Sequence, residues 1–300
     1  MQRVPHQRRE FSAGGTTRVV LTAMAAVLCT ALSAVAAPQK GIVSIGGDVT
    51  EIIYALGEAD RVVAVDTTST FPPEAMKSKA SVGYMRALSA EGVLSVGGDR
   101  MIANEKAGPP EAVAALKASG LTVTLIDDDE TERGVEEKIN AVAAALGKSD
   151  AGSVLVKTVR AQFDALRSAR AALSGPRKRV LFILVVRNGQ AIIGGANTSA
   201  SAVIELAGGQ NAVTNVVGFK PLTDEAVLAI APDVILTMHR GEGNSASIKA
   251  ALTLPGIRAT PAAKNDQIYE IDGQRLLGFG PRTPTAALDL MSKLYTSGVK

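Results

Sequence analysis

Tyr84 and Arg86 are the pair of side chains in this chain whose types and spacing most directly suggest chemistry. Gly83 precedes them, and because glycine tolerates backbone conformations that other residues avoid, we expect a turn that lifts the Tyr84 phenol off the scaffold. Arg86 follows two residues later and can point toward the same space. A nearby permanent cation favours phenolate over phenol, and phenolate is a hard oxygen ligand suited to ferric iron, including the iron of haem. A loop tyrosine that packs on a helix would also account for the pattern.

The content of cysteine and histidine limits which other chemistry is available. Cys29 is the only cysteine, and His6 and His239 are the only histidines. Cys29 and His6 lie in a segment with the features of a removable leader, so the remaining chain has no cysteine and one histidine. Disulfides, thiolate metal sites and cysteine nucleophiles are therefore excluded, and multi-histidine metal capture is disfavoured. A serine hydrolase triad would have to use His239.

Residues 1–36 have the features of a secretory signal peptide. An arginine-bearing start leads into an apolar run over Val19–Leu32, and Ala34-Val35-Ala36 matches the small-x-small cleavage pattern, so the mature protein would begin near Ala37. The apolar run is shorter than the roughly 20 residues that span a bilayer. Arg8-Arg9 also resembles a twin-arginine signal, and a general secretory route fits as well.

The mature chain carries no net charge. Of 32 basic and 29 acidic residues, the leader contains four arginines and one glutamate, which leaves 28 of each sign. This balance gives no electrostatic reason to expect nucleic acid or an anionic membrane as a partner. With 46% hydrophobic residues, the chain can bury a sizeable core.

Apolar runs and helical patterns alternate along both halves of the mature chain. In the first half we expect strands at 41–45, 61–66, 100–103 and 121–126, and helices at 50–56, 90–95 and 110–119. This succession predicts an α/β fold with a mainly parallel sheet and ligand contacts at strand ends. A long helical stretch from Ser149 to Ser174 follows and is stopped by Gly175-Pro176. A second α/β succession occupies the remainder.

Three stretches carry a resemblance to a known family. The run Gly83–Ser89, the start Ser44–Gly57 and the segment Leu277–Arg282 resemble the periplasmic haem-binding proteins that feed bacterial ABC importers. The resemblance implies a class III periplasmic binding protein, with two Rossmann-like lobes joined by one long helix. The implied division is a signal peptide at 1–36, an N-terminal lobe at 37–148, a linker helix at 149–175 and a C-terminal lobe at 176–300. A helical bridge resists bending, so closure on ligand binding should be small.

The same resemblance implies a non-enzymatic, periplasmic and monomeric protein that captures ferric haem in the cleft between its lobes. Tyr84 would be the axial iron ligand and Arg86 its charge partner. Arg187 and Arg240, each expected after a strand of the C-terminal lobe, would meet the propionates or the porphyrin edge. Some family members carry a histidine near position 187 as a second axial ligand; this chain has none there, which predicts five-coordinate haem. His239 is expected to point away from the cleft, although entry into it stays open.

Two glutamates, Glu91 and Glu225, each begin a short helix, one in each lobe. At a helix start a carboxylate is favoured by the helix dipole and stays solvated. In the family, these two positions resemble glutamates that pair with arginines of the inner-membrane permease, which works with its own ATPase. Helix-start charges without a further role would also explain either one alone.

Other interpretations of the sequence remain open. The same fold and export route would suit a ferric siderophore or cobalamin as ligand, and an exported α/β enzyme is a third possibility that lacks a credible nucleophile and base. The glycine pairs at 46–47 and 97–98 do not complete a nucleotide-binding pattern. The acidic run Asp127–Glu130 lacks calcium-loop spacing and reads as a solvated turn.

Overall fold

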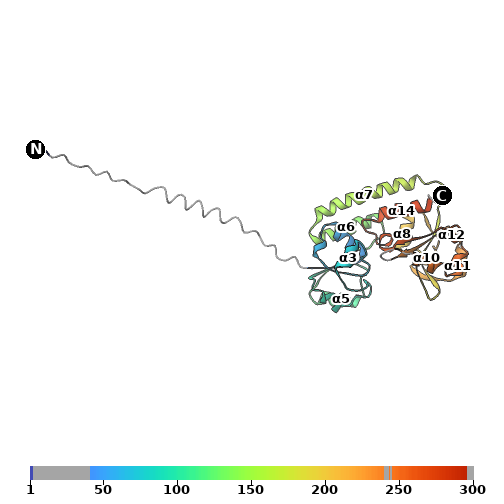
Figure 1. Ribbon diagram of the computed structural model, residues 1–300, viewed down its shortest axis with the longest axis horizontal. Helices are drawn as coiled ribbons and strands as arrows, with labels where there is room; N and C mark the ends of the chain where they lie inside the picture. Colours follow the sequence, from blue (N-terminus) through green and yellow to red (C-terminus); the bar gives the residue numbers. More distant parts are fainter. Residues whose placement is uncertain (3–40, 240–242, 244, 296–300) are drawn as a thin grey trace. The chain divides into compact units, whose positions relative to one another are not determined.

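The computed structural model of the protein describes residues 1–2, 41–239, 243 and 245–295 (Figure 1). Residues 1–39 and 40–300 form separate units, of which the second contains every helix and strand named below. The predicted signal peptide and its cleavage site lie outside the described residues, apart from Met1 and Gln2. Within the described part of the chain, no helix is long and apolar enough to cross a membrane.

Sheet A is a five-stranded parallel sheet with the strand order β3-β2-β1-β4-β5. Its strands are β1 Ile42–Ile45, β2 Val62–Val65, β3 Ala80–Ser81, β4 Arg100–Asn104 and β5 Thr122–Ile126. The central strand β1 is buried at every position, as expected for a parallel strand covered on both faces. The connections run in opposite directions from β1 and β4, which leaves a crevice outside the carboxyl ends of the strands.

Sheet B is mixed, with the order β11-β10-β6-β7-β9 and with β8 also paired to β6. Its strands are β6 Arg179–Arg187, β7 Gln190–Gly194, β8 Gln210–Asn211, β9 Phe219–Leu222, β10 Val234–His239 and β11 Ile268–Asp272. Strand β10 is parallel to β6 and β11, whereas β7 is antiparallel to β6 and β9. The edge strand β9 contains Pro221, which an edge tolerates because its ladder is open on one side.

Helices cover both faces of each sheet. They are α2 Gly47–Ala55, α3 Pro73–Ser78, α4 Ala90–Ser95, α5 Pro110–Ala118, α6 Glu132–Leu146, α7 Ser149–Ala171, α8 Ser199–Leu206, α9 Asp224–Ile230, α10 Ala246–Ala251, α11 Pro255–Arg258, α12 Pro261–Lys264, α13 Gly273–Leu277 and α14 Thr283–Tyr295, with a 3₁₀ turn at Ala59–Arg61. One face of sheet A packs on α4 and α5, and one face of sheet B packs on α9 to α12. The other faces share a single core cluster.

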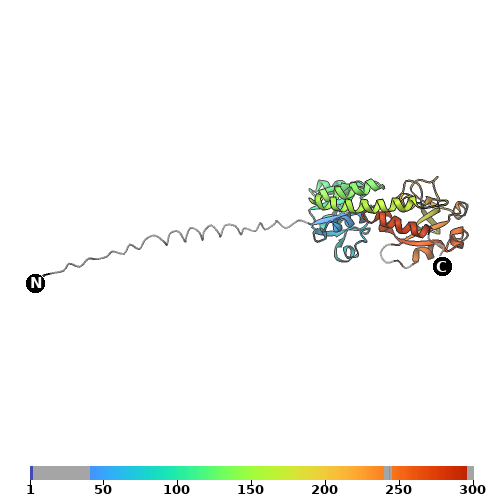
Figure 2. The ribbon, with the colours of Figure 1, turned by 90° about the horizontal axis from the view of Figure 1, so that it is seen from above.

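Helix α7 bridges the two sheets. It has 23 residues, which corresponds to about 35 Å, and it packs on α6 and α14. Figures 1 and 2 show it lying along both halves of the 40–300 unit. Its buried stripe includes Val159 and Phe163, which join the core cluster that contains Ile102 of sheet A and Phe182 of sheet B. The expected fold of two α/β lobes connected by one long helix is confirmed. The lobe boundaries stay predictions, because residues 40–300 form one compact unit.

A polar seam joins the two lobes beneath the crevice. The Gln274 side-chain oxygen accepts hydrogen bonds from the Thr70 hydroxyl and the Phe71 amide, both at 2.7 Å. Arg282 donates to the Glu51 carboxylate at 3.0 Å, and its guanidinium lies 3.6 Å from the centre of the Phe71 ring. Burial raises the pKa of Glu51 even though Arg282 opposes the shift. These contacts hold α2 and the loop after β2 against α13 and the segment before α14.

Candidate functional site

A pocket of about 220 Å³ lies between the two sheets, at the carboxyl ends of the strands of sheet A. On that side it is lined by residues that end or follow each of the five strands: Gly47, Asp48, Thr67, Thr68, Thr70, Tyr84, Met85, Arg86, Asn104, Lys106, Asp128 and Glu130. On the other side it is lined by Leu184, Ser199, Phe219, Met238, Gly273, Gln274, Leu277 and Gly278. The pocket therefore occupies the crevice that the strand order of sheet A creates.

Tyr84 and Arg86 project into this pocket from the loop after β3. Gly83 has a φ of 86°, in the left-handed region that favours glycine. Met85 is buried, whereas Tyr84 and Arg86 on either side of it are exposed, so these two side chains lie on the open side of the loop. The Gly108 amide donates to the Met85 carbonyl at 2.8 Å and fixes the loop. Neither the Tyr84 nor the Arg86 side chain has a hydrogen-bond or ion-pair partner among the described residues, so both are available to a ligand.

A buried lysine organises the wall of the pocket next to these two residues. The Lys138 ammonium is fully buried on α6 and lies 2.6 Å from the Asp48 carboxylate and 2.5 Å from the Asp128 carboxylate. Burial by itself lowers the pKa of a lysine, but the two carboxylates hold the pKa of Lys138 above its ordinary value. The Asn104 amide donates to Asp48 at 2.9 Å, and Lys138 also reaches the Gly278 carbonyl at 3.4 Å. The cluster thus connects the ends of β1, β4 and β5 to the C-terminal lobe.

Lys106 extends this cluster to the rim of the pocket. Its ammonium lies 2.8 Å from the Asp128 carboxylate and 3.1 Å from the Glu130 carboxylate. Burial alone would raise the pKa of Asp128, but Lys138 and Lys106 hold it below its ordinary value. The expectation that Asp127–Glu130 forms a solvated turn is wrong for Asp128, whose side chain is only 12% exposed. The physical reason is that the Asp128 carboxylate forms ion pairs with both Lys106 and Lys138, which compensates its burial.

The wall contributed by the C-terminal lobe is apolar. Leu184, Phe219, Met238 and Leu277 line it, and the Phe219 ring packs edge-on against Phe182 with ring centres 6.5 Å apart. An edge-to-face aromatic pair holds the Phe219 ring in a defined orientation. A flat apolar ligand would therefore meet a preformed surface on this side and the polar, charged wall on the other.

Arg187 lies at the tip of the β6–β7 hairpin. It is the last residue of β6, and Asn188-Gly189 forms the two-residue turn with φ values of 51° and 72°. Val186 packs into the core, so strand alternation puts Val185 and Arg187 on the opposite face of the hairpin. Arg187 is exposed and is not part of the pocket lining. Its assignment to a ligand stays a prediction.

The last two residues of β10 line different pockets. Met238 lines the pocket, whereas the next residue, His239, lines a different pocket together with Tyr269 and Glu270. This arrangement agrees with the expectation that His239 points away from the cleft. Arg240 lies outside the described residues, so its predicted contact with the ligand remains a prediction. Within the described residues, no three His, Cys, Asp or Glu side chains gather as a metal site.

Glu91 and Glu225 occupy equivalent positions on two short helices. Ser89 caps α4 by accepting from the Gly92 amide, and Thr223 caps α9 by accepting from the Ala226 amide. Each glutamate is the second helical residue after its cap and is exposed. Neither helix belongs to the pocket, but each follows a pocket-lining segment closely: α4 follows the Tyr84 loop, and α9 follows β9.

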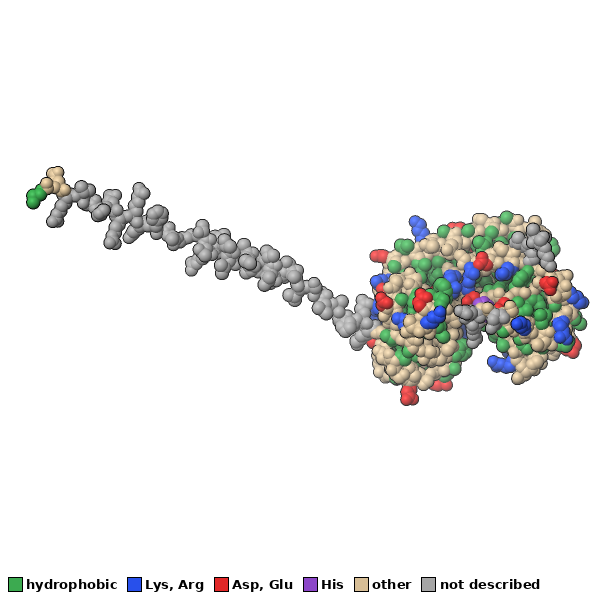
Figure 3. All heavy atoms as spheres, viewed as in Figure 1, with side chains coloured by type: hydrophobic (Ala, Val, Ile, Leu, Met, Phe, Trp, Pro, Cys, Tyr) green, Lys and Arg blue, Asp and Glu red, His purple; other side chains and the backbone are tan. Residues whose placement is uncertain are grey.

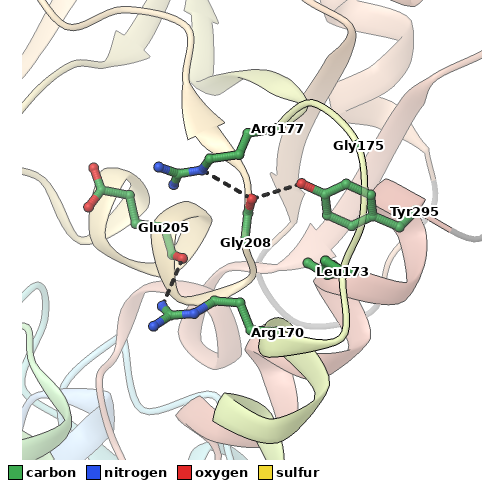
Figure 4. A pocket seen from close by; sticks show the side chains of 7 residues that line it. All are labelled: Arg170, Leu173, Gly175, Arg177, Glu205, Gly208 and Tyr295. Carbon is green, nitrogen blue, oxygen red and sulfur yellow. Dashed lines mark hydrogen bonds between the residues drawn. The ribbon is translucent and has the colours of Figure 1, made fainter.

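A second pocket, of about 440 Å³, lies where α7, α8 and α14 end (Figure 4). Arg177 and the Tyr295 hydroxyl both donate to the Gly208 carbonyl, and Arg170 donates to the Glu205 carbonyl. Carbonyls at and just beyond a helix end lack partners within the helix, so these donors serve as caps. The two cations in this pocket thus have a structural explanation.

Tyr84 and Arg86 are predicted from the sequence, but the charged wall of the pocket is not; it consists of Asp48, Lys138, Asp128, Lys106 and Glu130. Asp48 and Lys138 are 90 residues apart, and no local pattern connects them. The available signal was positional, because Asp48 and Asp128 each follow a predicted strand and the carboxyl ends of parallel strands share one edge. On the face seen in Figure 3, basic and acidic side chains are interspersed, in keeping with the balanced charge of the mature chain.

Comparison with known proteins places these features in context. Residues 42–275 match the periplasmic binding protein family. The structure of the periplasmic heme-binding protein BhuT, in complex with two hemes, is 41% identical, covers 85% of this chain and 97% of BhuT, and has a TM-score of 0.79. The periplasmic heme-binding protein RhuT from Roseiflexus sp. RS-1 is 39% identical, with coverages of 86% and 98% and a TM-score of 0.81.

Curated relatives point to transport more generally. An uncharacterized ABC transporter substrate-binding lipoprotein, YvrC of Bacillus subtilis, is 28% identical over 263 residues, which is 87% of this chain and 82% of the relative. Vitamin B12-binding proteins of Vibrio species are also among the relatives.

Proposed function

Because this chain belongs to the periplasmic binding protein family, we propose that it captures ferric haem between its lobes and delivers it to an inner-membrane ABC transporter for iron uptake. The observation that carries this proposal is the Tyr84–Arg86 pair, whose side chains have no hydrogen-bond or ion-pair partner among the described residues and face an apolar wall across the pocket. The likeness to two periplasmic heme-binding proteins at 41% and 39% identity supports haem as the ligand.

Each part of the pocket suits one part of a haem molecule. Tyr84 supplies a phenolate oxygen as axial ligand of the ferric iron, and Arg86 stabilises that charge. The apolar wall around Phe219 accepts a ring face. The pocket volume of about 220 Å³ is below the roughly 300–1,000 Å³ of typical small-molecule sites, so part of the macrocycle extends beyond it. Arg187 and Arg240 are proposed to meet the propionates there.

Iron coordination by Tyr84 alone is part of the proposal. No described histidine lines the pocket, and the hairpin tip next to Arg187 carries Asn188-Gly189. A five-coordinate ferric centre leaves one face of the iron open. Haem that is coordinated in this way can be released to a transporter by breaking a single protein–iron bond.

The proposed partner is the permease of an ABC transporter, together with its ATPase, in the inner membrane. The exposed glutamates Glu91 and Glu225 would pair with basic residues of the permease, one from each lobe. Leu94 and Leu228 lie three residues after them, one helical turn on, and are 41% and 49% exposed. Each lobe thus offers the same acidic and apolar pair at the same helical spacing. We propose that the mature protein acts as a monomer in the periplasm after removal of residues 1–36.

Cobalamin or a ferric siderophore is the alternative ligand, and the vitamin B12-binding relatives favour the first of these. The purified mature protein should be titrated in parallel with ferric haem, cyanocobalamin and a ferric hydroxamate siderophore, with visible absorption and isothermal titration calorimetry as readouts. The proposal predicts saturable binding of haem alone. Saturable binding of cobalamin or the siderophore without haem binding would replace haem as the cargo and leave the transport role in place.

A further inference from the structure

The charged wall of the pocket contains one more acid than base. Its members, joined by ion pairs of 2.5–3.1 Å, are Asp48, Lys138, Asp128, Lys106 and Glu130. Three carboxylates and two ammonium groups leave this wall with one net negative charge. Arg86 also lines the pocket, but its proposed role is to stabilise the Tyr84 phenolate. A ligand carboxylate next to the charged wall would therefore be repelled unless one of the two lysines of this wall turned toward it.

Only one of these two lysines can turn. The Lys138 side chain is fully buried and held by two carboxylates, whereas the Lys106 side chain is 38% exposed and lines the pocket. The backbone of Lys106 is fixed, because its amide donates to the Asn104 side chain at 2.9 Å. The ammonium stands at the end of a flexible four-carbon stem, so it can move while the backbone stays in place.

Movement of Lys106 removes the ion pair of Glu130, the most exposed of the three acids. Asp128 keeps Lys138 at 2.5 Å when Lys106 leaves, so its buried carboxylate stays neutralised. Glu130, in contrast, pairs with Lys106 alone among the described residues, and its side chain is 24% exposed. Water can therefore replace the lysine at Glu130 far more easily than at Asp128.

We infer that Lys106 exchanges its contact with Glu130 for a carboxylate of the bound ligand, and that Glu130 is the counter-ion that Lys106 holds in the empty pocket. The inference rests on the proposed function and deepens it, since it assigns a cation for a propionate on the N-terminal lobe, opposite the arginines expected on the other side. It also makes the presence of carboxylates a criterion for ligand selection at this pocket.

The test compares ferric protoporphyrin with its dimethyl ester, which has the same ring and iron but no free carboxylate. Absorption titrations should be run on the wild-type protein, Lys106→Gln, Glu130→Gln and the control Lys117→Gln, an exposed lysine on α5 outside the pocket. We expect Lys106→Gln to weaken haem binding about tenfold and to leave ester binding unchanged. Glu130→Gln should tighten haem binding about two- to fivefold, because Lys106 then leaves only one charged partner, Asp128, instead of two. Lys117→Gln should bind both ligands as the wild type does.

Different outcomes would overturn the role of Lys106 and the proposed function. Equal loss of haem and ester binding in Lys106→Gln, or no loss of either, would overturn the role of Lys106 while the wild-type titration still supports haem as the cargo. Unchanged or weaker haem binding in Glu130→Gln would overturn the exchange of counter-ions. If the wild-type protein binds neither porphyrin, the proposed function fails and this inference fails with it. Thermal unfolding of each variant identifies any loss of binding that comes from misfolding.

Discussion

Replacing Lys138 by methionine should destabilise the ligand-free protein by about 3 kcal/mol. Removal of one partner from a buried ion pair typically costs about 3–5 kcal/mol, because a charge stays buried without compensation. Here two carboxylates are affected, with side chains that are only 5% and 12% exposed. Each keeps one other partner, Asn104 for Asp48 at 2.9 Å and Lys106 for Asp128 at 2.8 Å, which argues for the lower end of the range.

Thermal unfolding followed by circular dichroism is a suitable assay. For a chain of this size, a loss of about 3 kcal/mol corresponds to a decrease in Tm of roughly 6–12 °C. The matched control is Lys117→Met, which removes an exposed lysine that has no ion pair in the described part of the chain and should change stability by less than about 0.5 kcal/mol.

A second substitution separates charge from packing. In the double variant Lys138→Met with Asp48→Asn, the uncompensated carboxylate on α2 is neutral, so we expect recovery of at least half of the lost stability. A Tm of Lys138→Met within 2 °C of the wild type would refute the structural role given to the lysine. The absence of recovery in the double variant would show that the loss comes from packing of the side chain.

Two further predictions concern acid stability and transport. The pKa of Asp128 is lowered from about 3.8 by its lysines although burial opposes this, so its contribution to stability is complete above that value and is lost as the pH falls through the folded-state pKa. Urea midpoints should therefore decrease as the pH falls below about 3.8, and Asp128→Asn should flatten this decrease; an equally steep decrease in the variant would contradict the assignment. Glu91→Ala combined with Glu225→Ala should leave haem binding intact but impair haem-dependent growth or uptake, and equal uptake by the double variant would remove the docking proposal.

The sequence predicts the framework of the fold well, because local signals mark most elements. Helix α4 begins and ends where expected, since Ser89 is a strong N-cap and an apolar run follows it. Helix α6 was not predicted, although Thr131 as N-cap and Gly147 in the left-handed conformation mark its ends. The acidic run Asp127–Glu130 just before it predicts a turn, and the helix that follows, whose buried face contains Lys138, is not predicted.

The candidate site is predictable only in part, because its members come from helices, strands and loops that are far apart in the sequence. Tyr84 and Arg86 are close in sequence and share one loop, so their proximity follows from spacing alone. The pairing of Asp48 with Lys138 spans 90 residues and depends on how α6 packs on α2. In the apolar wall, Phe219 belongs to the edge strand β9, which includes Pro221, a residue that weakens any prediction of a strand from sequence.

The most direct test of the central claim is the visible absorption spectrum of the ferric haem complex of the wild-type protein, Tyr84→Phe and the control Tyr54→Phe. Tyr54 is on α2 and is not part of the pocket lining, so it tests for a general effect of losing a phenol. We predict the charge-transfer bands of tyrosinate-bound ferric haem in the wild type and in Tyr54→Phe, and their loss in Tyr84→Phe. An unchanged spectrum in Tyr84→Phe would contradict the claim that Tyr84 binds the iron.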